Sequence, residues 1–358
     1  MKKIAIIGTN GIPSKYGGFE TLVEYLVNYL SAHYDLTVFC SSITNLDKIH
    51  EYRGCKLKYI PFRANGWQSI IYDIISIFRS YRKFDKILIL GASGTIVLPL
   101  LFNYKDKFIF NFGGLDWERS KWNYLTRKFL KFSESMGIKY SAHLISDNIG
   151  IQKYIQKEYK RNSTLITYGG DQVYKVVPKL SDLQKYPFIA ASYAFTLARI
   201  QPDNNIDLLL NSFNEHSPFP LVFVGNWQSC PYGIKTKAKY IDRPKIILLD
   251  AIYDKREINL LRSNCKVYLH GHSAGGTNPA LVEAMNLSLP ILAYDCIFNK
   301  YTTEFKAVYF SDSMELSEEL KKITDNDLII IGEKMYNIAK KVYHWKTIAK
   351  KYSEVIDN

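Results

Sequence analysis

Short apolar runs alternate with longer amphipathic segments along the first half of the chain. The compact, β-branched run 3–8 predicts a buried strand, and apolar residues at helical spacing over 19–31 predict a helix after it. Further strands are predicted at 36–40, 57–61, 86–90, 107–112 and 143–146, with helices at 67–81, 119–135 and 149–158. Strands that alternate with helices predict a parallel sheet covered on both faces.

The alternation resumes after a less regular stretch, 168–187, which we interpret as an interdomain linker. The second half predicts strands at 193–198, 221–224, 245–248, 266–269 and 290–293, helices at 204–213, 233–240, 254–262 and 279–287, and a helical tail from 317. We therefore predict an α/β protein of two Rossmann-like, doubly wound domains facing a cleft, residues 1–167 and 188–340. Residues 341–358 should form a helix that packs back toward the N-terminal domain. Ligands of such sheets bind at the carboxyl ends of the strands.

Composition supports this picture. The 358 residues suffice for two cores, and 47% apolar with 23% charged residues is typical of a soluble globular protein. The five cysteines form no C-x-x-C pair, which favours reduced thiols in a cytosolic protein over disulfides or a zinc site. The first apolar run is too short for a signal peptide, and the longest, 87–102, falls short of the roughly 20 residues that span a bilayer.

The net charge of +13 is unevenly distributed. Residues 1–170 carry 24 Lys and Arg against 13 Asp and Glu, whereas the remainder carries 23 against 21. A basic half suggests an acidic partner, either nucleic acid or an anionic membrane face; a solvated basic surface is the alternative. The sequence has no signature of a nucleic-acid-binding fold. The predicted helix 67–81 combines Trp67, Ile70, Ile71, Ile74, Ile75 and Phe78 with Arg79, Arg82 and Lys83. It is therefore either a membrane-contact helix or an ordinary core helix.

Two glycine-containing loops follow predicted strands. In the first, residues 8–21, Gly17 and Gly18 directly precede a helix, where backbone amides favour an anion. The loop matches neither G-x-G-x-x-G nor a Walker A motif, and a turn without a ligand is the alternative. In the second loop, Asn278 can cap the helix that begins at Pro279, and amides there suit a phosphate or sugar oxygen.

Three further positions carry candidate chemistry. Glu283, about one turn into that helix, can accept two hydroxyl protons of a ribose, or is simply favoured by the helix dipole. Arg199, at the end of a predicted strand, suits a diphosphate, or forms a surface salt bridge. Segment 113–122 combines glycines, carboxylates, Trp117 and Trp122, and so suits a sugar ring unless both tryptophans pack into the core.

His270 and His272 alternate on an extended segment, but no third metal ligand stands out. We therefore expect these histidines to pack and to hydrogen-bond the loop, with no metal bound.

Four segments together resemble a known family: "IGTNGIPSKYGGFETLVEYL", "GGLDWERSKW", "ARIQPDNNIDLLLNSF" and "HGHSAGGTNPALVEAMNLSLPILAYD". They are similar to the retaining, GT-B fold glycosyltransferases of family 4, and most similar to the branch of bacterial polysaccharide rhamnosyltransferases. The resemblance implies transfer of L-rhamnose from dTDP-rhamnose, with retention and without a metal or cofactor. The alternatives are a hexosyltransferase that uses a UDP-sugar and, more remotely, a non-enzymatic nucleotide- or nucleic-acid-binding protein.

The resemblance also implies roles for individual residues. In the family's Glu-x7-Glu motif the second glutamate matches Glu283, which would hold the nucleotide ribose. The first would fall at Gly275, so backbone groups of Gly276, Thr277 and Asn278 would contact the sugar. Of the family's Arg and Lys diphosphate pair, this chain keeps Arg199.

The lysine position of that pair is Asn204 or Asn205, which leaves Lys235 or Lys237 to supply the second charge. The family's histidine near the sugar is also missing, because residues 111–114 read Asn-Phe-Gly-Gly, and Asp116 is the nearest polar candidate.

These arguments yield one set of expected site residues. The catalytic candidates are Arg199, Glu283 and Asp116; the donor-binding set is Gly17, Gly18, Arg199, Lys235, His272, Gly276, Thr277, Asn278 and Glu283; and the acceptor-side set is Phe19, Glu20, Trp117 and Arg119. The expected partners are a nucleotide sugar, a saccharide or lipid-diphosphate-linked saccharide acceptor in capsule or O-antigen synthesis, and an anionic membrane surface, but not nucleic acid. The expected location is the cytoplasm, either free or peripherally on the inner face of the cytoplasmic membrane.

Overall fold

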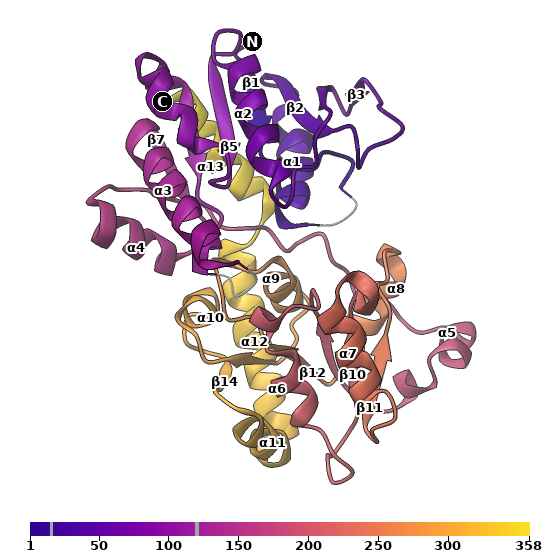
Figure 1. Ribbon diagram of the computed structural model, residues 1–358. Coiled ribbons are helices and arrows are strands. Elements are labelled where there is room, and N and C mark those ends of the chain that lie inside the picture. Colours follow the sequence, from indigo (N-terminus) through magenta and orange to yellow (C-terminus); the bar gives the residue numbers. More distant parts are fainter. Residues whose placement is uncertain (15–16, 119–121) are drawn as a thin grey trace. The chain divides into compact units, whose positions relative to one another are not determined.

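The computed structural model describes residues 1–14, 17–118 and 122–358 and divides into two compact units (Figure 1). The first unit contains Met1–Tyr168 and Trp345–Asn358, and the second contains Gly169–His344. Each unit is built on one parallel sheet. The two parallel-sheet α/β domains predicted from the sequence are therefore confirmed.

The sheet of the first unit has the order β3-β4-β2-β1-β5-β6-β7-β8, parallel except for the β3–β4 pair. Its strands are β1 (Lys3–Ile7), β2 (Asp35–Ser41), β3 (Glu51–Tyr52), β4 (Cys55–Ile60), β5 (Lys86–Leu90), β6 (Phe108–Asn111), β7 (His143–Ser146) and β8 (Thr164–Leu165). Its helices are α1 (Gly18–Leu30), α2 (Gln68–Ser80), α3 (Tyr124–Tyr140), α4 (Ile149–Tyr159) and α13 (Trp345–Asp357), with 3-10 segments η1 (Thr95–Lys107) and η2 (Asp116–Glu118). The central strands are buried on both faces, which explains their continuous apolar runs.

The last helix of the chain, α13, completes the core of the first unit. The rings of Tyr25 on α1 and Trp345 on α13 stack with their centroids 4.6 Å apart. The buried Tyr352 accepts a hydrogen bond of 2.5 Å from Asn111 Nδ2 at the end of β6. Because the last strand residue is tied to α13, this helix helps fix the carboxyl end of the sheet.

The sheet of the second unit has the order β11-β10-β9-β12-β13-β14 and is parallel throughout. Its strands are β9 (Ala194–Leu197), β10 (Leu221–Val224), β11 (Ile246–Leu249), β12 (Val267–His270), β13 (Ile291–Tyr294) and β14 (Val308–Phe310). Its helices are α5 (Leu180–Lys185), α6 (Ile206–Asn211), α7 (Pro231–Tyr240), α8 (Lys255–Ser263), α9 (Pro279–Asn286), α10 (Ile297–Thr302), α11 (Ser313–Lys322) and α12 (Asp325–Val342); the 3-10 segments are η3 (Pro187–Ala190), η4 (Pro202–Asn204) and η5 (Trp227–Ser229).

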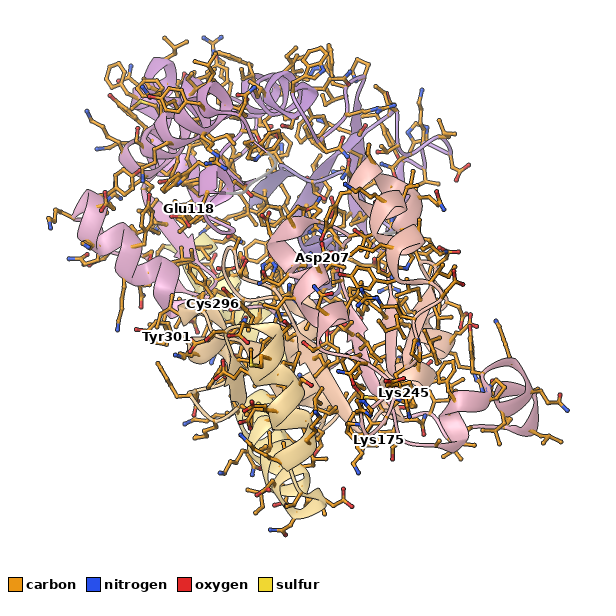
Figure 2. All side chains as sticks on the ribbon, turned by 60° about the horizontal axis from the view of Figure 1, so that its bottom comes forward. Glu118, Lys175, Asp207, Lys245, Cys296 and Tyr301 are labelled. Atoms are coloured by element: carbon orange, nitrogen blue, oxygen red, sulfur yellow. The ribbon has the colours of Figure 1, made fainter. Side chains whose placement is uncertain are left out.

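Polar side chains join helices within the second unit. Asp207 on α6 (labelled in Figure 2) accepts hydrogen bonds from the hydroxyls of Tyr232, at 2.7 Å, and Tyr240, at 3.0 Å, both on α7. The stretch interpreted as a linker carries α5, whose Asp182 forms an ion pair of 2.7 Å with Arg256 on α8. Most of that stretch therefore belongs to the second unit.

One predicted helix starts later than expected and another is split, each for a local reason. The helix predicted over 119–135 begins at Tyr124, because the Asn123 side chain accepts a hydrogen bond from Thr126 N at 2.9 Å and caps it. The helix predicted over 204–213 is split at Asn205, whose φ of +50° ends η4 before α6 starts. Among the described residues, every helix is too short or too polar to span a bilayer.

Candidate functional site

The glycine-rich loop of the first unit is held by carboxylates of α1. Glu20 is buried, and its Oε1 accepts hydrogen bonds from Asn10 N at 2.8 Å and Thr9 Oγ1 at 3.2 Å. Glu24 Oε2 accepts a hydrogen bond from Ser14 N at 2.7 Å. The amides of Asn10 and Ser14 are therefore bonded to carboxylates and do not cradle an anion. The structure gives Glu20, predicted on the acceptor side, a loop-stabilising role.

Glycine is required at position 17 for two reasons. Its φ is +128°, and a Cβ there would collide with Oε2 of Glu20. Gly17 precedes α1, and Gly18 is its first residue. The predicted amide pair thus lies at the helix N-terminus, next to the carboxylate that fixes the loop.

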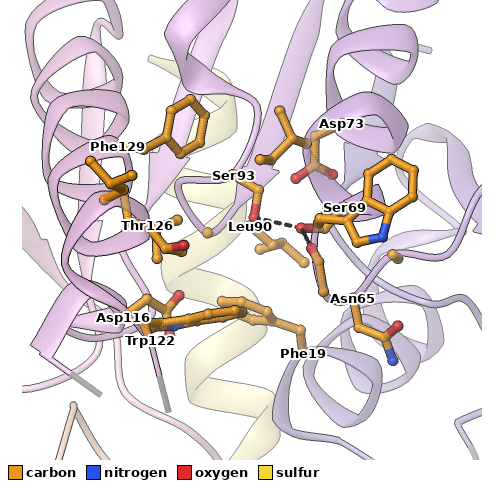
Figure 3. Close-up of a pocket in the computed structure, with 18 residues that line it drawn as sticks. Phe19, Asn65, Ser69, Asp73, Leu90, Ser93, Asp116, Trp122, Thr126 and Phe129 are labelled. Carbon is orange, nitrogen blue, oxygen red and sulfur yellow. Dashed lines mark hydrogen bonds between the residues drawn. The ribbon is translucent and has the colours of Figure 1, made fainter. Parts of the chain in front are cut away.

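A cavity of about 460 Å³ lies in the first unit (Figure 3). Phe19 and Asp116, predicted separately from two distant loops, both line it, together with Trp122. Phe19 packs against Gly113, where φ is +61° and a Cβ would collide with the ring. This glycine therefore makes room for the aromatic wall of the cavity.

Trp117, which we predicted on the acceptor side, is not among the residues that line this cavity, whereas Trp122 is. Lys131 Nζ lies 4.4 Å from the ring centroid of Trp117, a cation–π contact that turns the indole toward α3. Arg119, the remaining acceptor-side candidate, lies outside the described residues.

A buried carboxyl, Glu134, lies beside Trp117's partner Lys131. The hydroxyls of Tyr154 and Tyr159 donate to Glu134 Oε1 at 2.7 Å and 2.6 Å, and Lys131 Nζ lies 3.4 Å from the same oxygen. Burial raises the pKa of Glu134 to about 7, against the opposing effect of the tyrosine and lysine donors. This cluster joins α3 to α4.

The sequence argument missed the polar part of the cavity. Asn65, Ser69 and Asp73, at and on α2, and Ser93, after β5, line it. The available signal was Asp73, a lone carboxylate in an otherwise apolar helical pattern. Because we interpreted the apolar residues of that helix either as a membrane face or as ordinary core packing, the buried side of α2 received no functional prediction.

In the second unit, the loops after β9 and β12 are joined by two asparagines. Asn204 Nδ2 donates to the Arg199 carbonyl at 2.7 Å, and its Oδ1 lies 2.7 Å from His272 Nδ1. Asn205 Nδ2 donates to the Gly271 carbonyl at 2.9 Å. The positions where the family pattern has lysine therefore hold the Arg199 and His272 loops together. Arg199 itself is exposed just beyond β9.

The two candidate lysines differ in their surroundings. Lys237 forms an ion pair of 2.8 Å with Asp250, whereas Lys235 is exposed on α7. The first turn of α7 packs closely on Ile200, because a Cβ at Gly233 would lie 3.1 Å from its side chain. Lys235 is thus carried by the helix that contacts the residue after Arg199.

Glu283 on α9 has partners on both oxygens. Arg262 Nη1 donates to Oε2 at 2.5 Å, and Gln172 Nε2 donates to Oε1 at 2.6 Å. The Arg262 side chain is 3% exposed and that of Glu283 18%. A carboxylate offers about four lone-pair positions, so Glu283 keeps acceptor capacity for ribose hydroxyls.

At the start of α9, backbone amides that we predicted to be exposed are hydrogen-bonded to Asn278. Asn278 Oδ1 accepts from Ala280 N at 2.9 Å, and the Asn278 carbonyl accepts from Leu281 N at 3.1 Å. The amides of Ala280 and Leu281 are therefore bonded within the turn, and the predicted donor-site residues Gly276, Thr277 and Asn278 precede them. Gly275 is buried with φ of +91°, so a glutamate would be strained there.

The two histidines occupy different environments. His270 is buried, which holds its pKa well below the ordinary range, while His272 is half-buried. The described part of the chain holds no group of three His, Cys, Asp or Glu side chains suited to a metal ion.

Comparison with known proteins identifies the enzyme class. Residues 1–171 match a domain of unknown function, DUF1972, and residues 190–345 match the family Glycosyl transferases group 1. No curated protein sequence matches the chain.

Solved structures resemble the whole chain at low identity. Sucrose-phosphate synthase from Thermosynechococcus elongatus has a TM-score of 0.81 at 15% identity, over 99% of this chain and 98% of that one. Anabaena HepE in complex with UDP-glucose has a TM-score of 0.74 at 14% identity, over 100% of both chains. The chain has the GT-B fold, and with its group 1 domain it is a glycosyltransferase.

Proposed function

We propose that this glycosyltransferase moves L-rhamnose from dTDP-rhamnose, with retention, onto a lipid-linked saccharide in bacterial surface polysaccharide synthesis. The observation that carries the donor half is Glu283, held on α9 by Arg262 and Gln172 with acceptor capacity to spare. Arg199 is exposed on the loop that Asn204 ties to His272. The choice of rhamnose rests on the sequence motifs. The HepE complex with UDP-glucose favours a UDP-hexose donor as the second candidate.

The reaction breaks the bond between the anomeric carbon of the sugar and the diphosphate through an oxocarbenium-like state. The oxygen of an acceptor hydroxyl bonds to that carbon, and the hydroxyl proton passes to the departing nucleoside diphosphate. Arg199 would stabilise the departing charge, and the amides at 276–278 would contact the sugar or phosphate oxygens. Lys235 on α7 would supply a second positive charge. On the acceptor side, Phe19 and Asp116 would meet the saccharide. No metal and no protein nucleophile enter this scheme.

Thermal stabilisation by nucleotide sugars tests the donor proposal. We expect dTDP-rhamnose to raise the melting temperature selectively over UDP-glucose, UDP-galactose, UDP-N-acetylglucosamine and GDP-mannose. A ligand at a hundredfold excess over Kd stabilises by about 2.7 kcal/mol. Arg199→Ala should weaken the binding at least tenfold, because a charge-assisted hydrogen bond contributes about 1.5–3 kcal/mol. Lys237→Ala, which removes a charge already paired with Asp250, is the control and should bind normally.

A selective shift with a UDP-sugar would replace rhamnose by a hexose and leave the enzyme class unchanged. If none of the nucleotide sugars raised the melting temperature, the proposed donor site itself would be rejected.

Anionic membrane contact is the second part of the proposal, and its surface involves more than α2. The rings of Phe78, Tyr81 and Tyr104 pack edge to face at 6.2 Å and 4.9 Å and link α2 to η1. On η1, Leu100 and Phe102 are 75% and 58% exposed. Basic residues flank these side chains: Arg79, Arg82, Lys83, Lys105 and Lys107. The isoleucines of α2 named above are instead half-buried.

We expect the protein to sediment with vesicles of phosphatidylglycerol and phosphatidylcholine but not with pure phosphatidylcholine. Each basic residue near an anionic surface contributes about 1 kcal/mol. The double variant Leu100→Ser, Phe102→Ser should reduce binding to the anionic vesicles. The control double variant Met314→Ser, Ile329→Ser changes similarly exposed residues of the second unit and should not reduce it. Equal loss in both double variants, or binding to neutral vesicles, would reject this surface.

A further inference from the structure

The cavity of the first unit contains a buried carboxyl that the proposed donor chemistry does not use. Asp73 on α2 is 3% exposed, and its Oδ1 has no hydrogen-bond partner among the described residues. Burial raises the pKa of Asp73 well above its ordinary value. Its Cβ packs so closely on Gly94 that a Cβ at that glycine would collide with it, so the backbone fixes the position of the carboxyl.

The carboxyl faces other polar groups in the cavity. Figure 3 shows Asp73 directed inward, near Ser69 and Ser93, whose hydroxyl oxygens are 3.2 Å apart. A buried polar group without a hydrogen-bond partner destabilises the folded protein. Retention of such a group in a cavity is typical of a binding site, where a ligand supplies the missing hydrogen bond.

The lining restricts the chemistry of that ligand. The described lining residues include two acidic side chains, Asp73 and Asp116, and no Lys, Arg or His, so none of them offers a phosphate a positive counter-charge. A hydrocarbon chain would cover the carboxyl without offering it a hydrogen bond, which is also costly. The aromatic side chains of Phe19 and Trp122 and the hydroxyls of Ser69 and Ser93 suit a ring that is apolar on its faces and polar at its edge.

We propose that this cavity binds one uncharged sugar ring of the acceptor and that Asp73 hydrogen-bonds a hydroxyl of that ring. The inference rests on the proposed glycosyl transfer and specifies which part of the acceptor the first unit takes up. The aromatic side chains contact the faces of the ring, and the edge hydroxyls meet Ser69, Ser93 and Asp73. The diphosphate of a lipid-linked acceptor remains outside this cavity.

Tryptophan fluorescence provides a direct test, because Trp67 and Trp122 line the cavity. Methyl glycosides of rhamnose, glucose, galactose and N-acetylglucosamine would be titrated into the full-length protein, with glucose 1-phosphate as the charged probe. We expect at least one methyl glycoside to bind in the millimolar range and glucose 1-phosphate to bind more weakly than methyl glucoside. Tighter binding of the phosphate, or no binding of any glycoside, overturns the proposal.

Variants of Asp73 separate binding from folding. Asp73→Leu should lose at least tenfold in glycoside affinity and at the same time raise the melting temperature, because it removes an unpartnered buried polar group. Asp73→Asn, which keeps the shape and hydrogen-bonding capacity, should retain measurable binding. Ser76→Ala is the control, since Ser76 is buried on the same helix, bonds the Tyr72 carbonyl at 2.7 Å and does not line the cavity. Unchanged glycoside affinity in Asp73→Leu overturns the role of Asp73.

The nucleotide-sugar assay on the same variants distinguishes this inference from the proposed function. If nucleotide sugars stabilise wild type and Asp73→Leu alike while glycosides do not bind either, the enzyme proposal stands and the sugar cavity is rejected. If glycosides bind and no nucleotide sugar does, the cavity stands and the proposed transfer is rejected.

Discussion

Replacing Arg262 by methionine is expected to destabilise the protein by about 3–5 kcal/mol, because it leaves the Glu283 carboxylate without its buried counter-charge. Arg262 Nη1 donates to Glu283 Oε2 at 2.5 Å, and the Arg262 side chain is 3% exposed. The free energy of unfolding in urea measures the effect. Arg256→Met is the matched control: Arg256 lies on the same helix, but its side chain is 40% exposed, so loss of its ion pair with Asp182 should destabilise the protein much less.

The double variant Arg262→Met, Glu283→Leu separates folding from donor binding. Removal of both charges leaves no unpaired ion, so most of the lost stability should return. Nucleotide sugars should nevertheless fail to stabilise this variant if Glu283 holds the ribose. If the double variant is stable and nucleotide sugars still raise its melting temperature, the role of Glu283 is only to pair with Arg262.

The fold was predictable because buried parallel strands have a strong local signature. The apolar runs of β5 and β7 coincide with the predicted ranges 86–90 and 143–146. Edge strands such as β3 and β8 contain two residues each, too few to produce a periodic pattern. The helix break at Asn205 also had no sequence signal, because it depends on a hydrogen bond from Asn205 to the loop after β12.

The sequence predicted site residues that belong to one local motif. It did not predict the orientation of side chains that depends on contacts made only in the folded protein. Phe19 and Asp116 were named from separate loops, and the fold brings both to one cavity. The orientation of Trp117 depends on Lys131, and that of Glu20 on the backbone of its own loop. Such contacts have no sequence signal, because the residue types alone permit either a substrate contact or a structural one.

The Glu134 cluster is expected to make stability depend on pH across neutrality. The folded protein raises the pKa of Glu134 to about 7 from an ordinary value near 4.5, so the folded state binds more protons than the unfolded state between these values. The stabilising contribution is therefore fully present below about pH 4.5 and is lost as the pH rises through about 7. At about 1.4 kcal/mol per pKa unit, the loss amounts to about 3 kcal/mol.

Glu134→Gln should remove this loss, because the amide stays neutral at every pH and can still accept from Tyr154 and Tyr159. The measurement is the free energy of unfolding in urea at pH 5 and pH 8, with the difference compared between wild type and variant. Glu257→Gln is the control: Lys185 and Tyr186 hold the pKa of Glu257 below its ordinary range, so its contribution falls away at lower pH. An unchanged pH difference in Glu134→Gln would mean that Glu134 is already ionised in the folded state, with Lys131 as its counter-ion.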